Sequence, residues 1–211
     1  MIEKFEPTVD QKKYLKELRW ESTMKEADII IDGLGKRIDS GIKETVTALK
    51  VNDYETTGSC EGHLDHGLPH PWVDVEMSLT ADERKQMKET IDRLILAQNT
   101  HKEYDDADLA KRDIFLSKKV LFENKLSDLL EEFYTQHEPK NLDIKLFLLK
   151  THSDVRIQPT FGRGIGKKNW TEFDVQQKRL TELEREENLK LSREEMQAFA
   201  QFLKKKFFEK D

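Results

Sequence analysis

The chain has one cysteine among its 211 residues, few glycines and prolines, and no long apolar run. A single cysteine cannot form an internal disulfide, which favours a reducing, cytoplasmic environment. The longest apolar stretches, ADIII and IKLFLLK, are far shorter than a membrane-spanning helix. The N-terminus lacks the apolar segment of a secretory signal. We therefore expect a soluble, cytoplasmic protein without a membrane partner.

Charged residues are abundant, at 37% of the chain against 36% apolar residues, and the formal net charge is −6. This balance is typical of long helices that are exposed to solvent. A negative net charge disfavours general binding to the phosphates of RNA, so RNA is a possible partner that the charge does not favour, and a small anionic substrate is also possible. The long amphipathic helices expected over residues 114–136 and 170–208 are also compatible with a homodimer.

Periodic apolar residues predict several helices. Thr8 and Gln11 form a capping-box pattern that places a helical segment at about residues 1–26, and an apolar stripe predicts a further helix over 27–49. Thr80 with Glu83 forms a second box, ahead of a helix. Ser192 with Glu195 forms a third, within a C-terminal helical extension of about 170–211.

Two pairs of short strands are expected between these helices. The segments around 54–57 and 72–79 flank an unusual loop, and the segments IKLFLLK and VRIQPT form a second hairpin. Because strands and helices occur in clusters, the sequence predicts an α+β fold rather than a parallel α/β fold. We expect one domain over residues 1–211, with a small, mainly antiparallel sheet packed against long amphipathic helices.

The loop TTGSCEGHLDHGLPHPW, residues 56–72, concentrates the reactive side chains of the chain. It contains the only cysteine and three of the nine glycines, and it contains four potential metal ligands, Cys60, His63, His66 and His70. Thiolate and imidazole are the usual ligands of zinc. One short loop rarely supplies all four ligands, so we expect two or three of them to join a ligand from elsewhere. The bound ion would be zinc or another divalent transition metal.

A metal-free site is the second interpretation of this loop. Cys60 would act as a nucleophile, His63 as its base, and Asp65 or Glu61 would orient the imidazole. Ser59, Gly62 and Trp72 would then bind substrate. In a third interpretation, Cys60 is a small buried apolar residue and the loop only shapes the fold.

A second unusual stretch, THSDVRIQPTFGRGIGKKNW, covers residues 151–170 and combines glycines with basic side chains. If both hairpins belong to one sheet, Arg156 reaches the loop and clamps an anion there. Arg163 and Lys167 would contribute to binding a phosphate. The alternatives are an Arg156–carboxylate pair on a sheet face and a flexible, solvated turn.

The segment YETTGSCEGH resembles a strand-and-loop motif of the tRNA wybutosine-synthesis methyltransferases that act third in their pathway. His63 stands where that family has arginine, and Gly58 where it has serine. The matching residues are Thr56, Thr57, Ser59, Cys60 and Gly62, with Trp72 at the start of the next strand. The longer pattern TTGSCEGHLDxGxPxPWVD also resembles bacterial hypothetical proteins. These resemblances imply a polar loop at the end of a sheet and, as an alternative function, RNA modification.

These observations lead to one expected function and two alternatives. The leading expectation is a small enzyme that acts on an anionic, phosphate-bearing substrate at the Cys/His loop. The first alternative is a protein that modifies or binds RNA. The second is a helical interaction protein without catalysis.

Overall fold

A computed structural model describes residues 8–31, 35–150, 154–160 and 180–210, and it confirms an α+β fold with a small antiparallel sheet. Contacts group the chain into two compact units. The first comprises Met1–Glu76 and Glu132–Asp211, and the second comprises Met77–Glu131. None of the described helices is both long enough and apolar enough to cross a membrane.

The first unit contains the sheet. Its strands are β1 (Glu55–Cys60), β2 (Trp72–Glu76), β3 (Leu146–Lys150) and β4 (Asp154–Pro159), in the order β1-β2-β4-β3. All neighbouring strands are antiparallel, so the two predicted hairpins do share one sheet. Residues at alternate positions of β2 and β4 are buried and form one apolar face: Val73, Val75, Val155 and Ile157.

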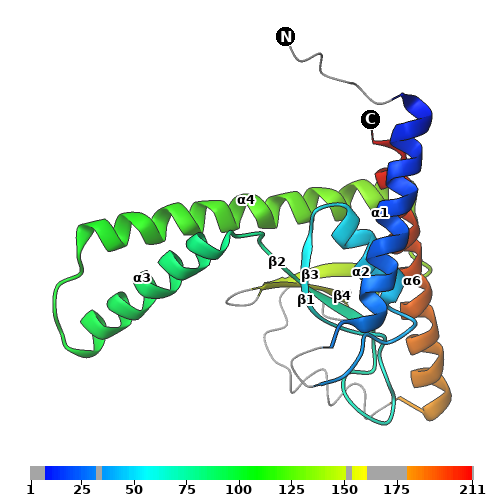
Figure 1. The fold of residues 1–211 in the computed structure, drawn as a ribbon. Coiled ribbons are helices and arrows are strands. Elements are labelled where there is room, and N and C mark those ends of the chain that lie inside the picture. Colours follow the sequence, from blue (N-terminus) through cyan, green and yellow to red (C-terminus); the bar gives the residue numbers. More distant parts are fainter. Residues whose placement is uncertain (1–7, 32–34, 151–153, 161–179, 211) are drawn as a thin grey trace. The chain divides into compact units, whose positions relative to one another are not determined.

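Three helices belong wholly to the same unit: α1 (Val9–Ile29), α2 (Lys43–Val51) and α6 (Glu182–Glu209). Helix α2 contacts α1, α6 and strand β1, so it lies at the centre of this unit (Figure 1). Its Leu49 and the α6 residues Phe199 and Leu203 have no exposed surface. Burial of these apolar side chains provides the main favourable free energy for the packing.

The helix predicted over residues 27–49 is wrong. Helix α1 ends at Ile29 and α2 starts only at Lys43, and an isolated β-bridge between Ile31 and Arg37 lies in between. Gly35 has a φ of +75°, which a helix does not allow and which glycine adopts without strain. The apolar stripe was therefore interrupted by local backbone geometry, and the interruption places Asp39 in a loop.

Two of the three predicted capping boxes are confirmed, at Thr8 with Gln11 and at Thr80 with Glu83. The third is wrong, because α6 begins about three turns earlier, where Thr181 and Glu184 form the box. Ser192 lies inside the helix and its hydroxyl donates to the Asn188 carbonyl at 2.6 Å. A Ser-x-x-Glu pattern fits a helix interior as well as a helix start.

The second unit is a pair of antiparallel helices, α3 (Ala81–Asn99) and the larger part of α4 (Asp106–Gln136). Lys118 pairs with Glu83 at 2.7 Å, and Arg93 donates two hydrogen bonds to Asp108. The helix expected to start at Ile114 starts eight residues earlier. The polar segment before Ile114 is helical because the Asp105 carboxylate accepts the Ala107 N–H at the first turn.

Candidate functional site

The site lies where the sheet ends and the unusual loop begins. Strand β1 ends at Cys60, which pairs across the sheet with Trp72 at the start of β2. The chain turns directly after Cys60, because Gly62 has a φ of +82°. A Cβ atom at Gly62 would lie 2.5 Å from the carbonyl carbon of His70, so only glycine fits there. The His63 N–H closes the loop by donating to the Leu68 carbonyl at 3.0 Å.

Three side chains of different chemistry converge at this turn: Asp39, Cys60 and His63. One potential ligand atom of each lies within 4.8 Å of those of the other two. Asp39 Oδ2 lies 3.2 Å from His63 Nε2 and accepts the Glu61 backbone N–H at 3.1 Å. Asp39 comes from the loop that interrupts the predicted helix, so the sequence pattern did not indicate it.

The charges in this cluster favour a cation. Burial raises the pKa of the Cys60 thiol, the Gly62 backbone N–H opposes this, and the carboxylates of Asp39 and Glu61 raise the pKa further. Burial also acts to raise the pKa of Asp39, but the Glu61 N–H and the His63 ring outweigh it, so the net pKa is lowered. The resting site therefore holds a carboxylate beside a protonated thiol.

Helix α6 and the segment before α2 hold the loop in place from two sides. Arg193 donates from Nε to the Glu61 carbonyl at 2.9 Å and from Nη2 to the Gly62 carbonyl at 2.6 Å. The Glu61 side chain accepts the Gly41 N–H at 2.7 Å. These bonds fix the backbone on both sides of the turn and thereby fix the directions of Cys60 and His63.

His66 and Asp65 form a second, more exposed group with His63. The rings of His63 and His66 stack at 4.2 Å with an angle of 16° between their planes, and His66 Nδ1 lies 2.9 Å from Asp65 Oδ1. A ring nitrogen binds a metal in the plane of its ring, and one ion cannot lie in two parallel planes 4.2 Å apart. His66 therefore covers one face of His63 and is poorly placed to share an ion with it.

His70, the fourth predicted ligand, is buried with 2% of its surface exposed. It belongs to neither group of potential ligands found among the described residues. The structure thus brings Cys60 and His63 together with Asp39 in one group of potential ligands, and His66 and Asp65 together with His63 in the other.

Arg156 lies on β4 opposite Asp74 of β2. Its guanidinium donates two parallel hydrogen bonds to that carboxylate, at 2.7 and 2.8 Å, and its central carbon lies 3.8 Å from the centre of the Trp72 ring. This is the Arg–carboxylate pair that the sequence left open, and Asp74 occupies the side of the guanidinium that an anion would bind. Ser59 pairs with Val73 in the sheet. Arg163 and Lys167 lie outside the described residues.

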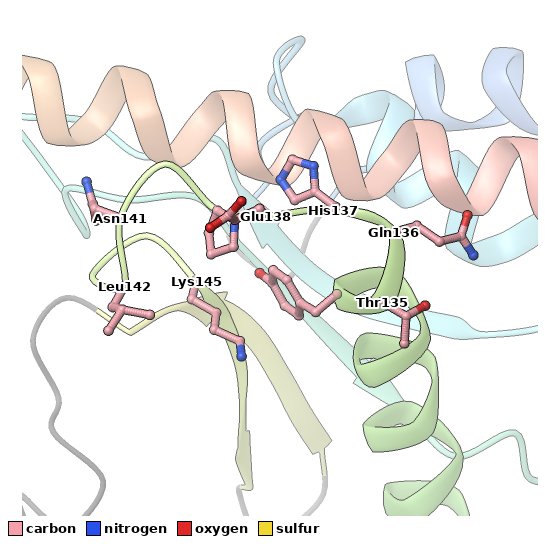
Figure 2. Close-up of a pocket in the computed structure, with 9 residues that line it drawn as sticks. Thr135, Gln136, His137, Glu138, Asn141, Leu142 and Lys145 are labelled. Atoms are coloured by element: carbon pink, nitrogen blue, oxygen red, sulfur yellow. The ribbon is translucent and has the colours of Figure 1, made fainter.

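A separate pocket of about 680 Å³ lies beyond the C-terminal end of α4 (Figure 2). Near it, the buried Glu195 accepts the Tyr134 hydroxyl at 2.8 Å and lies 2.9 Å from His137 Nε2. The Lys145 ammonium lies 4.7 Å from the centre of the Tyr134 ring. Through its contact with Glu195, His137 joins the end of α4 to α6. The polar groups here bond mainly to one another, as in a structural anchor.

No family model, curated protein or solved structure matches this chain. The functional argument therefore depends on the residues and the geometry of the Asp39–Cys60–His63 cluster.

Proposed function

We propose that the protein is a metal-dependent enzyme in which Asp39, Cys60 and His63 hold a divalent transition metal, with zinc as the best match. The convergence of these three ligand atoms within 4.8 Å is the observation that carries the proposal. Thiolate, imidazole and carboxylate are the three side-chain ligands that zinc binds in proteins. Three protein ligands leave one coordination position for water or substrate, which is the arrangement of catalytic zinc sites.

The charge of the cluster supports this proposal. A carboxylate and a thiolate together carry two negative charges, which match a divalent ion. Without the ion, burial first and then the nearby carboxylates disfavour the thiolate, and both raise the pKa of Cys60. An ion would release the thiol proton, as metal binding to cysteine generally does.

The metal-free thiol mechanism has less support. A nucleophilic cysteine needs a lowered pKa, whereas burial, Asp39 and Glu61 raise the pKa of Cys60. The His63 Nε2 atom is within hydrogen-bonding distance of Asp39 Oδ2, so the imidazole already has a partner other than the thiol. Metal binding and not direct thiol attack is therefore the function that we infer for this pair.

We also propose an anionic, phosphate-bearing substrate, although Arg156 is not the group that would attract it. Arg156 is paired with Asp74, and the side chains next to Cys60 are mainly acidic. The attraction for an anion would come from the metal ion, which can polarise a phosphoryl oxygen and activate a bound water. We propose a cytoplasmic location for this activity, in keeping with a single cysteine. RNA modification stays a prediction, which salt-sensitive tRNA binding would test.

The test is elemental analysis of untagged protein, purified from zinc-supplemented cells, together with the variants Asp39→Asn, Cys60→Ser and His63→Ala. We expect close to one zinc per chain in the unchanged protein and a large loss in each variant. The variant His66→Ala is the matched control, because His66 stacks on His63 without joining the cluster. We expect it to retain zinc.

Absence of metal from the unchanged protein, also after direct titration with zinc, would rule out the proposal. Retention of zinc by both Cys60→Ser and His63→Ala would rule out this cluster as its site. Loss of zinc in His66→Ala would point to a ligand set within the loop. Hydrolysis of p-nitrophenyl phosphate by zinc-loaded protein, absent in His63→Ala, would support the enzymatic part of the proposal.

A further inference from the structure

The helical hairpin of the second unit has no buried apolar residue along most of its length. Between residues 77 and 125, which the structure describes throughout, every side chain that is buried is polar or charged. Large apolar side chains are instead exposed on both helices: Ile91, Ile95, Leu96, Ile114, Leu116, Val120 and Leu121. The first buried apolar residue along the hairpin is Leu126.

Two helices alone do not stabilise such a hairpin. The ion pairs Arg93–Asp108 and Lys118–Glu83 join them. Both members of Lys118–Glu83 are exposed, and such a pair contributes only about 0–1 kcal/mol. In the other pair Asp108 is buried but Arg93 is half exposed, and neither pair replaces the burial of an apolar face. Most helical stability in proteins comes from packing an apolar face against another element. The exposed side chains therefore indicate a partner that covers them.

The spacing of the exposed residues indicates what kind of partner fits. Ile91 and Ile95 are four residues apart on α3, and Leu116 and Val120 are four apart on α4, so each pair shares one side of its helix. Ile114 and Leu121, seven residues apart, form a separate stripe on α4. Helices with more than one apolar stripe are typical of bundles in which each helix contacts two neighbours.

We propose that this hairpin, residues 81–131, packs antiparallel against the same hairpin of a second copy of the chain and forms a four-helix bundle. The charge pattern of the hairpin indicates that its partner is a second copy of the chain. At the tip of the hairpin, residues 101–108, Glu103, Asp105 and Asp106 outnumber Lys102, while Asp108 pairs with Arg93 inside the hairpin. The stem on α4, residues 111–125, carries five basic residues and two acidic ones: Lys111, Arg112, Lys118, Lys119, Lys125, Asp113 and Glu123. Three of the basic residues pair within the chain, with Glu83, Asp113 and Glu123, so Lys111 and Lys125 are the ones that would meet an acidic tip.

An antiparallel arrangement brings the acidic tip of each copy to the basic stem of the other. The contact is then made twice, as two-fold symmetry requires. A parallel arrangement would instead place the two acidic tips together, which like charges disfavour. The hairpin thus matches itself in both charge and apolar surface, and this interface does not depend on the metal site proposed at Asp39.

The test uses two full-length charge-reversal variants. The tip variant is Asp105→Lys/Asp106→Lys, and the stem variant is Lys111→Glu/Lys125→Glu. In an antiparallel homodimer of either variant, side chains of like charge face each other at both contacts. We therefore expect the dimer dissociation constant of each variant to rise roughly tenfold or more in sedimentation equilibrium. A mixture of the two variants restores opposite charges at both contacts. We therefore expect the mixture to form heterodimers about as tightly as the unchanged protein.

A pair of apolar variants provides a second test. Ile95→Glu should produce monomers, whereas Leu183→Glu, at an exposed apolar residue of α6, should leave the dimer intact. An unchanged protein that remains at its chain mass of 24.9 kDa at high concentration would overturn the proposal. A dimer that survives Ile95→Glu, or a variant mixture that stays monomeric while both variants are folded by circular dichroism, would also overturn it.

Discussion

Asp39 Oδ2 binds both the backbone N–H of Glu61 and the ring of His63, at 3.1 and 3.2 Å. One carboxylate thus fixes the turn after β1 and one of the side chains that the turn presents. A residue in a loop between two helices thereby organises a second loop at the end of the sheet. Four predictions follow from the contacts around these loops and from the anchor at the end of α4.

Replacing Asp39 with asparagine should make the Cys60 thiol more reactive in metal-free protein. The carboxylate raises the pKa of Cys60, so its removal should lower that pKa and increase the thiolate fraction at a given pH. An asparagine side-chain oxygen can still accept the Glu61 N–H. The measurement is the rate of iodoacetamide alkylation as a function of pH after treatment with EDTA.

The matched control for this experiment is Asp65→Asn, because Asp65 is exposed and pairs with His66 instead. Its alkylation profile should follow that of the unchanged protein. If Asp39→Asn leaves the pH profile of alkylation unmoved, the carboxylate does not act on Cys60 as described.

Gly62→Ala should destabilise the protein far more than Gly67→Ala. Both glycines have positive φ angles, of +82° and +67°. A Cβ at Gly62 would lie 2.5 Å from His70 backbone, whereas nothing lies within 4 Å of one at Gly67. We expect the free energy of unfolding to fall by about 2–5 kcal/mol at Gly62 and by about 1 kcal/mol at Gly67. Urea denaturation would measure both free energies of unfolding. Equal losses in the two variants would contradict the close approach of Gly62 to the backbone of His70.

Arg193→Met should loosen the loop while the variant keeps much of the side chain's apolar packing. It removes two hydrogen bonds to the Glu61 and Gly62 carbonyls. Because Arg193 is partly exposed, we expect a modest loss of stability, of about 1 kcal/mol. Supporting contacts of this kind typically alter metal affinity by about 10–100-fold, so zinc should bind at least tenfold more weakly.

Zinc titration with a competing chelator would measure that change. Arg112→Met is the control, since Arg112 is exposed and bonds to the adjacent Asp113. Equal zinc affinity in Arg193→Met and Arg112→Met would show that Arg193 does not support the site.

Ionisation of Tyr134 should make the free energy of unfolding fall steeply at alkaline pH. Burial raises the pKa of Tyr134 well above its usual range; the Leu146 N–H opposes this, and the Glu195 carboxylate adds to it. The folded state therefore binds the phenolic proton more tightly than the unfolded state does. This contribution is complete below about pH 10, the ordinary tyrosine pKa, and is lost as pH rises above it.

Tyr134→Phe should reduce stability at pH 7 by about 1–3 kcal/mol, because Glu195 loses a donor inside the protein. It should also flatten the fall in stability above pH 10 that Tyr134 causes. The exposed Tyr104 provides the control, and Tyr104→Phe should change stability by less than about 0.5 kcal/mol. Urea denaturation between pH 7 and pH 11 would test this, and an unchanged alkaline slope in Tyr134→Phe would contradict it.

The sequence was informative about the sheet because strands leave local patterns. Alternating apolar residues in 144–150 and 155–160 and the turn-forming residues between them predict a hairpin without any long-range information. The same local reasoning singled out Cys60 and His63, since glycines and reactive side chains rarely cluster by chance. It also singled out Arg156 and left open its pairing with a carboxylate, and the structure identifies Asp74 as that partner.

Asp39 could not be predicted in the same way. Its apolar neighbours recur at helical spacing, so the predicted helix 27–49 included it, whereas the positive φ of Gly35 and the bridge between Ile31 and Arg37 break that pattern. Its contacts with Glu61 and His63 depend on tertiary packing of α2 against β1, which no local pattern encodes. The start of α6 was missed for a similar reason, because two capping boxes compete within the same charged segment.

Arg193 also sets the order in which the site matures during protein synthesis. The ribosome makes Asp39, Cys60 and His63 before it makes α6, the helix that carries Arg193. Until that helix docks, the carbonyls of Glu61 and Gly62 lack the donors that hold the turn. A nascent chain thus carries these three side chains before the turn that presents them is held, and the turn is fixed only after α6 has been made and has docked.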